Sequence, residues 1–261
     1  MAKHIPGPLY YEMQGQTGLP MIFLHSTPDD HRLWLFQTAH FSAWYRTIAV
    51  DLAGYGRSPA PQEGVTIADQ AEACWELVDR ITSGPIIIQG NSMGSEVAMH
   101  MADQQPKRSL CMILSGCGYL PDIREIQLRG KQAYRDEGIA RRRAQVLFHF
   151  SPRMRDTPLV QHYADMVCAL SNAGTLESII LMNEALANAK PELYPRLKVP
   201  CLIITASEDF TRESAYKLQS FIKGSEIVCM EGVGHANCFE APWEFDRICI
   251  DYLKNRGLFP G

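Results

Sequence analysis

The sequence predicts an α/β fold in which a mostly parallel sheet is covered by helices on both faces. Short apolar runs rich in β-branched residues alternate along the chain with stretches of helical periodicity, which is the pattern of parallel strands joined by crossover helices. One run, at residues 85–89, is apolar without alternation, as expected of a strand buried on both faces. Together these two observations define the fold class.

The predicted elements follow one another in a regular order. Three strand-like runs come first, at residues 9–13, 21–24 and 47–50. A helix is predicted over residues 67–81, because its apolar residues recur at helical spacing. The later elements are the strand at 85–89, a helix at 93–105, strands at 110–114, 199–204 and 227–230, and a last helix at 242–254.

The alternation of strands and helices stops after Tyr119. Residues 121–195 contain no strand-like run, only helical segments with many Arg, Met and Leu residues. Because the strand pattern resumes at residue 199, we predict one α/β core domain formed by residues 1–120 and 196–261. A helical insertion at residues 121–195 interrupts this core.

Composition argues against two classes of partner. The 261 residues carry a formal net charge of −4, and 46% of them are hydrophobic, enough for a sizeable core. The run Arg141-Arg142-Arg143 is smaller than the basic face that nucleic-acid binding favours. No apolar run approaches the ~20 residues that span a bilayer. We therefore expect neither a nucleic-acid partner nor a membrane.

Cysteine use bears on the cellular compartment. The eight cysteines are scattered through apolar segments without a C-x-x-C pair, which indicates buried thiols in a reducing compartment rather than a disulfide framework. Residues 1–10 show neither the apolar segment nor the cleavage site of an export signal. We expect a cytoplasmic protein.

The motif Gly90-Asn91-Ser92-Met93-Gly94 matches G-x-S-x-G and predicts a nucleophilic serine. By chance, roughly one chain of this length in ten would contain such a match. Here, however, the motif follows a buried-strand run and opens a helix, which is the strand–turn–helix context of a nucleophile elbow. Glycines let the backbone turn sharply and leave the Ser92 hydroxyl accessible.

A serine hydroxyl needs a neighbouring base, and His235 fits that role best. It lies in a glycine-rich loop between the last predicted strand and the last helix, where sheet enzymes place catalytic groups. His31, His149 and His162 fit surface or pocket-lining positions better, and His100 lies in the middle of a helix.

The supporting acid is predicted at Asp209, which is favoured over its neighbour Glu208. Both follow the strand-like run at residues 199–204. The chain order Ser92, Asp209, His235 is the serine–acid–histidine order of one class of hydrolases. An Asp at this point also caps a following helix, and the two roles are compatible.

Acyl transfer also needs donors that stabilise an oxyanion. The backbone N–H of Met93, at the start of the elbow helix, is one expected donor. The second is expected from the loop His25-Ser26-Thr27-Pro28, with the N–H of Thr27 favoured and that of Ser26 as the alternative. His25 itself is interpreted as a structural residue that holds this loop.

Across nearly its whole length the chain resembles the α/β-hydrolase superfamily. Four blocks in the expected order carry the resemblance: His25-Ser26-Thr27-Pro28, Asp51-Leu52-Ala53-Gly54-Tyr55-Gly56-Arg57-Ser58, Gly90-Asn91-Ser92-Met93-Gly94, and Gly234-His235 followed by Glu240, Pro242 and Phe245. The resemblance implies an eight-stranded sheet and a helical cap over the active site, inserted between the sixth and seventh strands. Candidate substrate-binding residues of this cap are Phe148, Phe150, Met154, Met166 and Met182.

Within the superfamily, two resemblances point in different directions. The elbow with Asn91 resembles that of the meta-cleavage-product hydrolases, which cut carbon–carbon bonds. The loop His25-Ser26 followed by Trp34 is closer to enol-lactonases and small carboxylesterases, although Ser26 replaces the usual glycine and Ser95 replaces a second glycine after the elbow. We favour hydrolysis of a small ester, lactone or related carbonyl compound, with carbon–carbon cleavage as the alternative.

Two further alternatives differ in kind. Hydroxynitrile lyases and cofactor-free oxygenases share the fold, and some small-molecule receptors keep it with a weakly active triad. Dehalogenases and epoxide hydrolases use an aspartate where Ser92 stands. No metal or dinucleotide motif is present, so we expect catalysis without cofactor or metal, on a small carbonyl substrate, by a monomer or homodimer.

Overall fold

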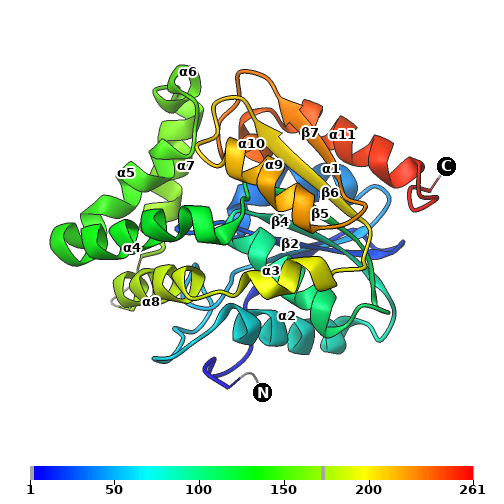
Figure 1. Ribbon diagram of the computed structural model, residues 1–261, viewed down its shortest axis with the longest axis horizontal. Coiled ribbons are helices and arrows are strands. Elements are labelled where there is room, and N and C mark those ends of the chain that lie inside the picture. The colour runs from blue at the N-terminus through cyan, green and yellow to red at the C-terminus, as the bar shows by residue number, and fades with distance from the viewer. Residues whose placement is uncertain (1–2, 172–173, 261) are drawn as a thin grey trace.

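Seven strands form one sheet in the computed structural model, which describes residues 3–171 and 174–260 (Figure 1). In chain order they are β1 (Tyr11–Gln14), β2 (Pro20–Leu24), β3 (Arg46–Val50), β4 (Ile86–Asn91), β5 (Ser109–Ser115), β6 (Cys201–Ala206) and β7 (Glu226–Met230). Their spatial order is β1-β3-β2-β4-β5-β6-β7, and every neighbouring pair is parallel except β1 with β3. The predicted α/β fold with a mostly parallel sheet is confirmed.

The expected eighth strand is absent from the described residues, so that expectation was wrong. The chain ahead of β1 contains Pro6 and Pro8, which cannot donate hydrogen bonds to a neighbouring strand. The backbone N–H of Tyr10 instead donates to Oγ of Ser58, at 2.8 Å. The helical insertion consequently lies between the fifth and sixth strands of this sheet.

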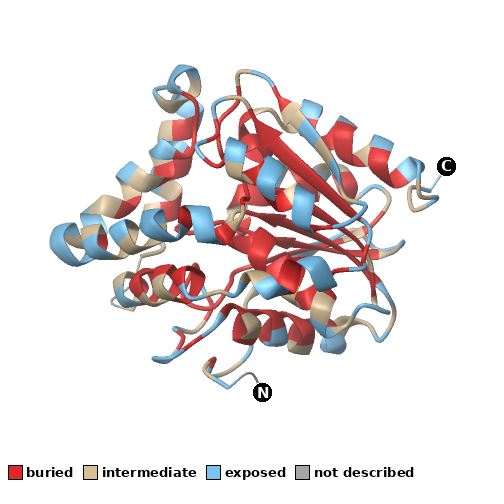
Figure 2. Ribbon diagram, in the orientation of Figure 1, coloured by how far each residue is buried: buried red, intermediate tan, exposed pale blue. Residues whose placement is uncertain are grey.

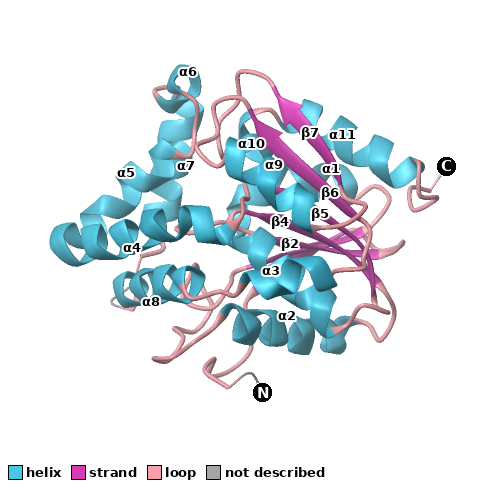
Figure 3. Cartoon of the chain, viewed as in Figure 1, coloured by secondary structure: helices cyan, strands magenta, loops and turns pink. Residues whose placement is uncertain are grey.

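Helices cover both faces of the sheet (Figure 3). They are α1 (Leu35–Phe41), α2 (Ile67–Ile81), α3 (Met93–Gln104), α9 (Arg212–Phe221), α10 (Asn237–Glu240) and α11 (Pro242–Lys254), with a 3₁₀ turn η1 at His31–Trp34. Helices α2, α3 and α9 pack on one face, and α1 and α11 pack on the other. The predicted helix at 67–81 begins with a capping box, in which Thr66 and Asp69 exchange hydrogen bonds.

Two hydrophobic clusters form the core, one on each face of the sheet. Ile86 and Ile88 of β4 belong to the cluster beneath α2 and α3, whereas Ile87 belongs to the cluster beneath α1 and α11. Successive side chains of a strand point to opposite faces. Because both faces of this strand are covered, its sequence is apolar throughout, and Figure 2 shows the central strands buried along their length.

The helical insertion is defined here as the described residues from 120 to 196. None of these residues forms a strand. Its elements are α4 (Leu120–Glu137), η2 (Gly138–Ala140), α5 (Arg141–Phe148), α6 (Pro152–Arg155), α7 (Pro158–Ala169), α8 (Thr175–Ala187) and η3 (Pro191–Arg196). Helix α4 packs along α8 and α5 packs against α7, on one side of the sheet (Figure 1). Within the described part of the chain, no helix combines the length and apolar character needed to cross a membrane.

Candidate active site

Ser92 occupies a sharp turn between β4 and α3. Its backbone has φ of 53° and ψ of −115°. Among the described residues, it is the one non-glycine residue with positive φ. This conformation costs roughly 1–3 kcal/mol and persists only where the surrounding structure enforces it. The structure therefore places Ser92 in the strand–turn–helix context that the sequence predicts.

Close backbone packing requires both glycines of this turn. A Cβ atom on Gly90 would lie 2.4 Å from the carbonyl oxygen of Gly94. A Cβ on Gly94 would lie 2.0 Å from the carbonyl oxygen of Leu24 and 2.8 Å from that of His25. The start of α3 is thus pressed against the end of β2 and the loop that follows it.

His235 and Asp209 form a buried pair at the ends of two neighbouring strands. Nδ1 of His235 lies 2.8 Å from Oδ1 of Asp209. Nε2 of His235 is buried and has no hydrogen-bond partner among the described groups, so it is not bonded to the Ser92 hydroxyl in this structure. An imidazole that donates through Nδ1 to a carboxylate keeps a lone pair on Nε2, which is the arrangement a general base needs.

Asp209 is held in its ionised form by its neighbours. Burial by itself would raise the pKa of Asp209, but His235 and the backbone N–H and hydroxyl of Thr211 outweigh it and hold that pKa below the usual carboxyl value. Glu208, the alternative acid, is exposed. The structure therefore brings Asp209, and not Glu208, to His235.

Close packing fixes the His235 ring beside the Ser92 turn. Phe210 stacks on the imidazole with a centroid distance of 4.4 Å and an interplanar angle of 27°. Nδ2 of Asn91 donates to the backbone carbonyl of His235 at 3.2 Å. Gly116, which lines the cavity next to Ser92, has no side chain, and a Cβ there would lie 3.2 Å from Cε1 of His235. Gly116 therefore adjoins both His235 and the cavity that Ser92 lines.

The loop after β2 is held by its own side chains. His25 accepts a hydrogen bond at Nε2 from the backbone N–H of Leu52, at 2.9 Å, and its Nδ1 lies 2.8 Å from the carbonyl oxygen of Ser26. The hydroxyl groups of Thr27 and Tyr55 lie 2.7 Å apart. His25 thus has the structural role expected of it, and the loop runs beside the first residues of α3.

A second acid–histidine pair, which was not predicted from the sequence, lies next to this loop. Asp29 is buried and accepts hydrogen bonds from the hydroxyl groups of Ser26 and Tyr163. Its Oδ2 lies 3.4 Å from Nδ1 of His149, whose ring is 4.9 Å from that of His235, measured between centroids. Only the position of Asp29, two residues after Thr27, could have suggested it from the sequence.

Glu240 ties the helical insertion to the loop that carries His235. Its carboxylate accepts hydrogen bonds from the backbone N–H of Ser151 at 2.9 Å, from the Ser151 hydroxyl and from the N–H of Gly234 at 3.1 Å. A Cβ on Gly234 would lie 2.6 Å from the Ser151 nitrogen. The loop before His235 is therefore fixed against the insertion.

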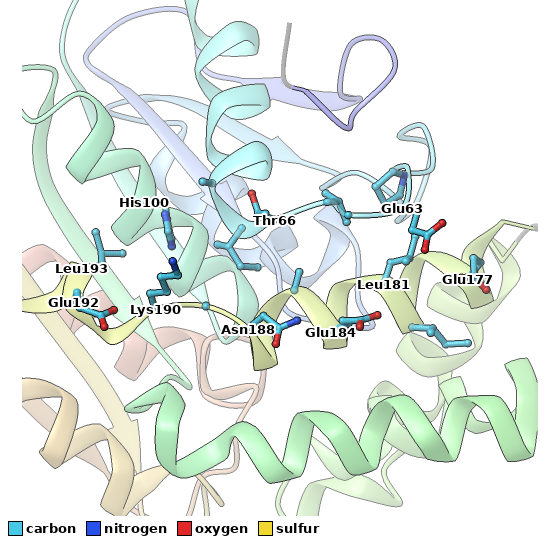
Figure 4. Close-up of a pocket in the computed structure, with 18 of the residues that line it drawn as sticks. Glu63, Thr66, His100, Glu177, Leu181, Glu184, Asn188, Lys190, Glu192 and Leu193 are labelled. Atoms are coloured by element: carbon cyan, nitrogen blue, oxygen red, sulfur yellow. The ribbon is translucent and has the colours of Figure 1, made fainter.

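Of two cavities that adjoin the helical insertion, the smaller reaches Ser92 and the larger does not. The smaller cavity has a volume of about 30 Å³, and its lining includes Leu120 and Leu186 of the insertion. The larger cavity, of about 1120 Å³, lies between α8 with η3 and the core helices α2 and α3 (Figure 4). Leu181 and Glu184 of α8 line it opposite Thr66 and His100. Helix α8 therefore separates the two cavities.

Glu96, one helical turn after Ser92, also lines the smaller cavity. Its carboxyl oxygens lie 3.3 and 3.4 Å from the Tyr194 hydroxyl. Burial raises the pKa of Glu96 to about 8, against the opposing effect of the Tyr194 hydrogen bond. At neutral pH this carboxyl group is mostly protonated, so it presents a neutral polar surface to the cavity.

The five apolar residues expected to bind substrate are not gathered at the smaller cavity, since none of them lines it. Phe148 is 55% exposed and packs on Phe210, which in turn stacks on His235. Phe150 is buried against Tyr163. The three methionines Met154, Met166 and Met182 pack into the two hydrophobic clusters.

Asp30, His31 and Asp51 form a buried cluster whose ligand atoms lie within 4.8 Å of one another. Hydrogen bonds within the chain already use these atoms. Oδ1 of Asp51 accepts from the backbone N–H of His31 at 2.8 Å and lies 2.7 Å from His31 Nδ1. Asp30 pairs with Arg32 at 2.6 Å. The cluster holds the turn after β3 in place rather than presenting free ligands.

Comparison with known proteins identifies the family of this fold. A model of the α/β hydrolase fold family matches residues 20–242. The chain is similar to the AB hydrolase superfamily protein YisY of Bacillus subtilis, with 26% identity over 91% of this chain and 92% of that protein. It is also similar to the 2-hydroxy-6-oxononadienedioate/2-hydroxy-6-oxononatrienedioate hydrolase of Escherichia coli K12, with 25% identity over 94% of this chain and 90% of that enzyme.

A third relative is longer than this chain. The dihydrolipoyllysine-residue acetyltransferase component of the acetoin cleaving system of Pseudomonas putida is 24% identical over 94% of this chain, which spans 66% of its length. Among solved structures, the enol-lactonase of Burkholderia xenovorans LB400 has a TM-score of 0.84 at 23% identity, covering 94% of this chain and 96% of that one. A thermophilic esterase of Thermogutta terrifontis has a TM-score of 0.83 at 23% identity, covering 95% and 93%.

Proposed function

This chain belongs to the α/β-hydrolase-fold family, and we propose that it is a serine hydrolase that cleaves a small ester or lactone through a Ser92 acyl-enzyme. One observation carries the proposal: the 2.8 Å contact between His235 and Asp209 leaves Nε2 of His235 free beside the strained turn of Ser92. The esterase and the enol-lactonase with similar folds support this substrate class.

In the proposed reaction, Nε2 of His235 accepts the proton of the Ser92 hydroxyl as Oγ attacks the carbonyl carbon. Asp209 orients the imidazole and stabilises its positive charge. The backbone N–H groups of Met93 and Thr27, with that of Ser26 as the alternative, donate to the oxyanion. His235 then returns its proton to the leaving alkoxide, which departs as the alcohol. A water molecule, deprotonated by His235, attacks the acyl-enzyme; the acid is released as His235 returns that proton to Oγ of Ser92.

We further propose that residues 121–195 act as a cap on a core formed by residues 1–120 and 196–261. Four residues of α4 and α8, namely Leu120, Ile123, Gln127 and Leu186, help to line the cavity beside Ser92. At about 30 Å³, that cavity is far smaller than the roughly 300–1,000 Å³ of ordinary ligand pockets, so an ester enters only after side chains or helices of the insertion move.

Carbon–carbon hydrolysis is the second candidate. The similarity to the Escherichia coli hydrolase supports it, since that enzyme's name gives substrates with a 2-hydroxy and a 6-oxo group rather than an ester or a lactone. The His149 ring adds a second imidazole 4.9 Å from His235. Cleavage of a carbon–carbon bond requires a proton on the leaving carbon, and a neutral imidazole can supply it after accepting a proton from the enol hydroxyl of the substrate.

The test combines covalent labelling with a substrate panel. A fluorophosphonate probe is expected to label the wild-type protein, and Ser92→Ala is expected to abolish labelling and turnover together. Values of kcat/KM are then compared for 4-nitrophenyl acetate, γ-butyrolactone and a ring-opened dienol diketone. Labelling that persists in Ser92→Ala refutes the nucleophile. A preference for the diketone selects the second candidate, and a protein that turns over none of the three argues for a receptor.

A further inference from the structure

Arg142 differs from its two neighbours in the basic run of α5. Arg141 pairs with Glu137 at 2.9 Å, and Arg143 pairs with Asp165 at 2.8 Å. Both of these arginines are partly exposed. The side chain of Arg142, in contrast, is 0% exposed. The sequence places all three on one short helix, but only Arg142 points into the protein.

The guanidinium of Arg142 has neutral partners only. Its Nε donates to the carbonyl oxygen of Pro28 at 3.0 Å, and its Nη1 donates to Oγ of Ser171 at 2.6 Å. Its Nη2 is buried without a hydrogen-bond partner among the described residues. No described carboxylate forms an ion pair with it. A buried guanidinium that forms no ion pair and keeps one nitrogen unpaired can take up an anion.

Tyr134 of α4 supplies a second unpaired donor. Its side chain is fully buried, and its hydroxyl has no partner among the described groups. The pKa of Tyr134 is raised by burial and by the nearby Tyr55, while the positive charge of Arg142 opposes the rise. Helix α4, which carries Tyr134, contacts α5, which carries Arg142, and both side chains are buried.

Both donors border the loop that the proposed reaction uses. Pro28, the acceptor of Arg142 Nε, directly follows Thr27, the proposed oxyanion donor. The Thr27 hydroxyl lies 2.7 Å from that of Tyr55, which interacts electrostatically with both Arg142 and Tyr134. An anion held by Arg142 and Tyr134 would therefore lie on the insertion side of the oxyanion loop.

We propose that Arg142 and Tyr134 form a subsite for a carboxylate carried by the substrate. The proposal rests on the proposed hydrolase function and narrows its substrates to esters or lactones that also carry a carboxylate. One guanidinium N–H and one phenol O–H match the two oxygens of a carboxylate. A dianionic phosphate is a poorer match, because the ionised Asp29 lies close enough to Tyr134 to affect its pKa.

Calorimetric titration measures this subsite without any turnover. The titrations use Ser92→Ala protein, with hexanoate and its neutral analogue hexanamide as probes. Hexanoate is expected to bind at least tenfold more tightly than hexanamide. Adding Arg142→Gln is expected to reduce that ratio to about one, and adding Tyr134→Phe to reduce it severalfold. Arg143→Gln, in the neighbouring arginine that pairs with Asp165, is the matched control and is expected to keep the full ratio.

Circular dichroism checks that each variant is folded. If Arg142→Gln does not fold, the test uses Arg142→Lys and Tyr134→Phe instead. Each is expected to lose part of the preference for hexanoate over hexanamide. Equal binding of the two probes to the Ser92→Ala protein overturns the subsite, as does a ratio that survives changes at both positions. Ester turnover by the wild-type protein is measured separately, so a failed hydrolase and a failed carboxylate subsite give different results.

Discussion

Oδ2 of Asp29 lies 3.4 Å from Nδ1 of His149, and this contact joins the loop after β2 to the helical insertion. The distance is long for a hydrogen bond, so we interpret the contact as electrostatic. Burial alone would raise the pKa of Asp29, but His149, Ser26 and Tyr163 outweigh it and lower that pKa. Burial lowers the pKa of His149. At neutral pH a carboxylate therefore faces a neutral imidazole.

Replacing this carboxylate is expected to destabilise the protein. Asp29→Asn substitutes an amide N–H for one of the oxygens that accept from Ser26 and Tyr163, leaving buried donors unpaired. The free energy of unfolding is expected to fall by about 2–3 kcal/mol, as measured by urea denaturation. Asp165→Asn is the control, since its pair with Arg143 is exposed and contributes roughly 0–1 kcal/mol. Equal small losses in both variants would contradict a stabilising role for Asp29.

The acid of the triad is expected to matter far more than its neighbour. Asp209→Asn removes the charge that orients His235 and is expected to lower kcat about 10⁴-fold, by analogy with serine proteases. Glu208→Gln changes an exposed carboxylate one residue away and is expected to leave kcat within about twofold. Ester turnover by the two purified variants measures this difference. If both substitutions prove mild, the acid must be sought elsewhere.

Local patterns in the sequence predicted the fold and the Ser92 turn, because strand runs, glycines and helix starts are local features. His235 and Asp209 were also within reach, since each follows a predicted strand and parallel strands end at one edge of a sheet. Contacts between the insertion and the core could not be predicted in this way. Asp29 with His149, and Glu240 with Ser151, join residues about 90 to 120 positions apart, and no periodicity encodes such pairs. The eighth strand was a family expectation that Pro6 and Pro8 disfavour in this chain.

Acid is expected to destabilise the protein partly through His100. Burial lowers the pKa of His100 to about 4; Asp103 opposes this effect and Arg196 adds to it. The unfolded chain has a histidine pKa near 6.5, so between about pH 6.5 and pH 4 the unfolded state binds the extra proton. Stability contributed by neutral His100 is therefore lost as the pH falls through this window. At pH 5.0 the loss from this residue is about 2 kcal/mol.

The measurement is urea denaturation at pH 7.5 and pH 5.0. His100→Gln is expected to reduce the pH-dependent change by about 2 kcal/mol relative to the wild type, whereas His162→Gln, at an exposed position, is expected to leave it unchanged. The comparison is made between variants because Glu96 has a raised pKa and stabilises the protein as the pH falls, opposite to His100, over the same pH range. If His100→Gln keeps the wild-type pH dependence of the free energy of unfolding, the lowered pKa assigned to His100 is wrong.

Enlarging the cavity beside Ser92 is expected to change which esters are cleaved. Leu186 lines that cavity from α8, and Leu186→Ala removes three carbons from its wall. The ratio of kcat/KM for 4-nitrophenyl hexanoate to that for 4-nitrophenyl acetate is expected to rise about tenfold, because each methylene accommodated in an apolar pocket contributes about 1 kcal/mol or more. Leu181→Ala, which alters only the larger cavity on the other side of α8, is the matched control and is expected to keep the wild-type ratio.

Truncating a buried leucine costs about 2–5 kcal/mol of stability, so urea denaturation must first show that Leu186→Ala is folded under the assay conditions. A folded Leu186→Ala protein with an unchanged ratio would mean that the acyl chain lies away from α8, and the proposed position of the cap over Ser92 would then be wrong.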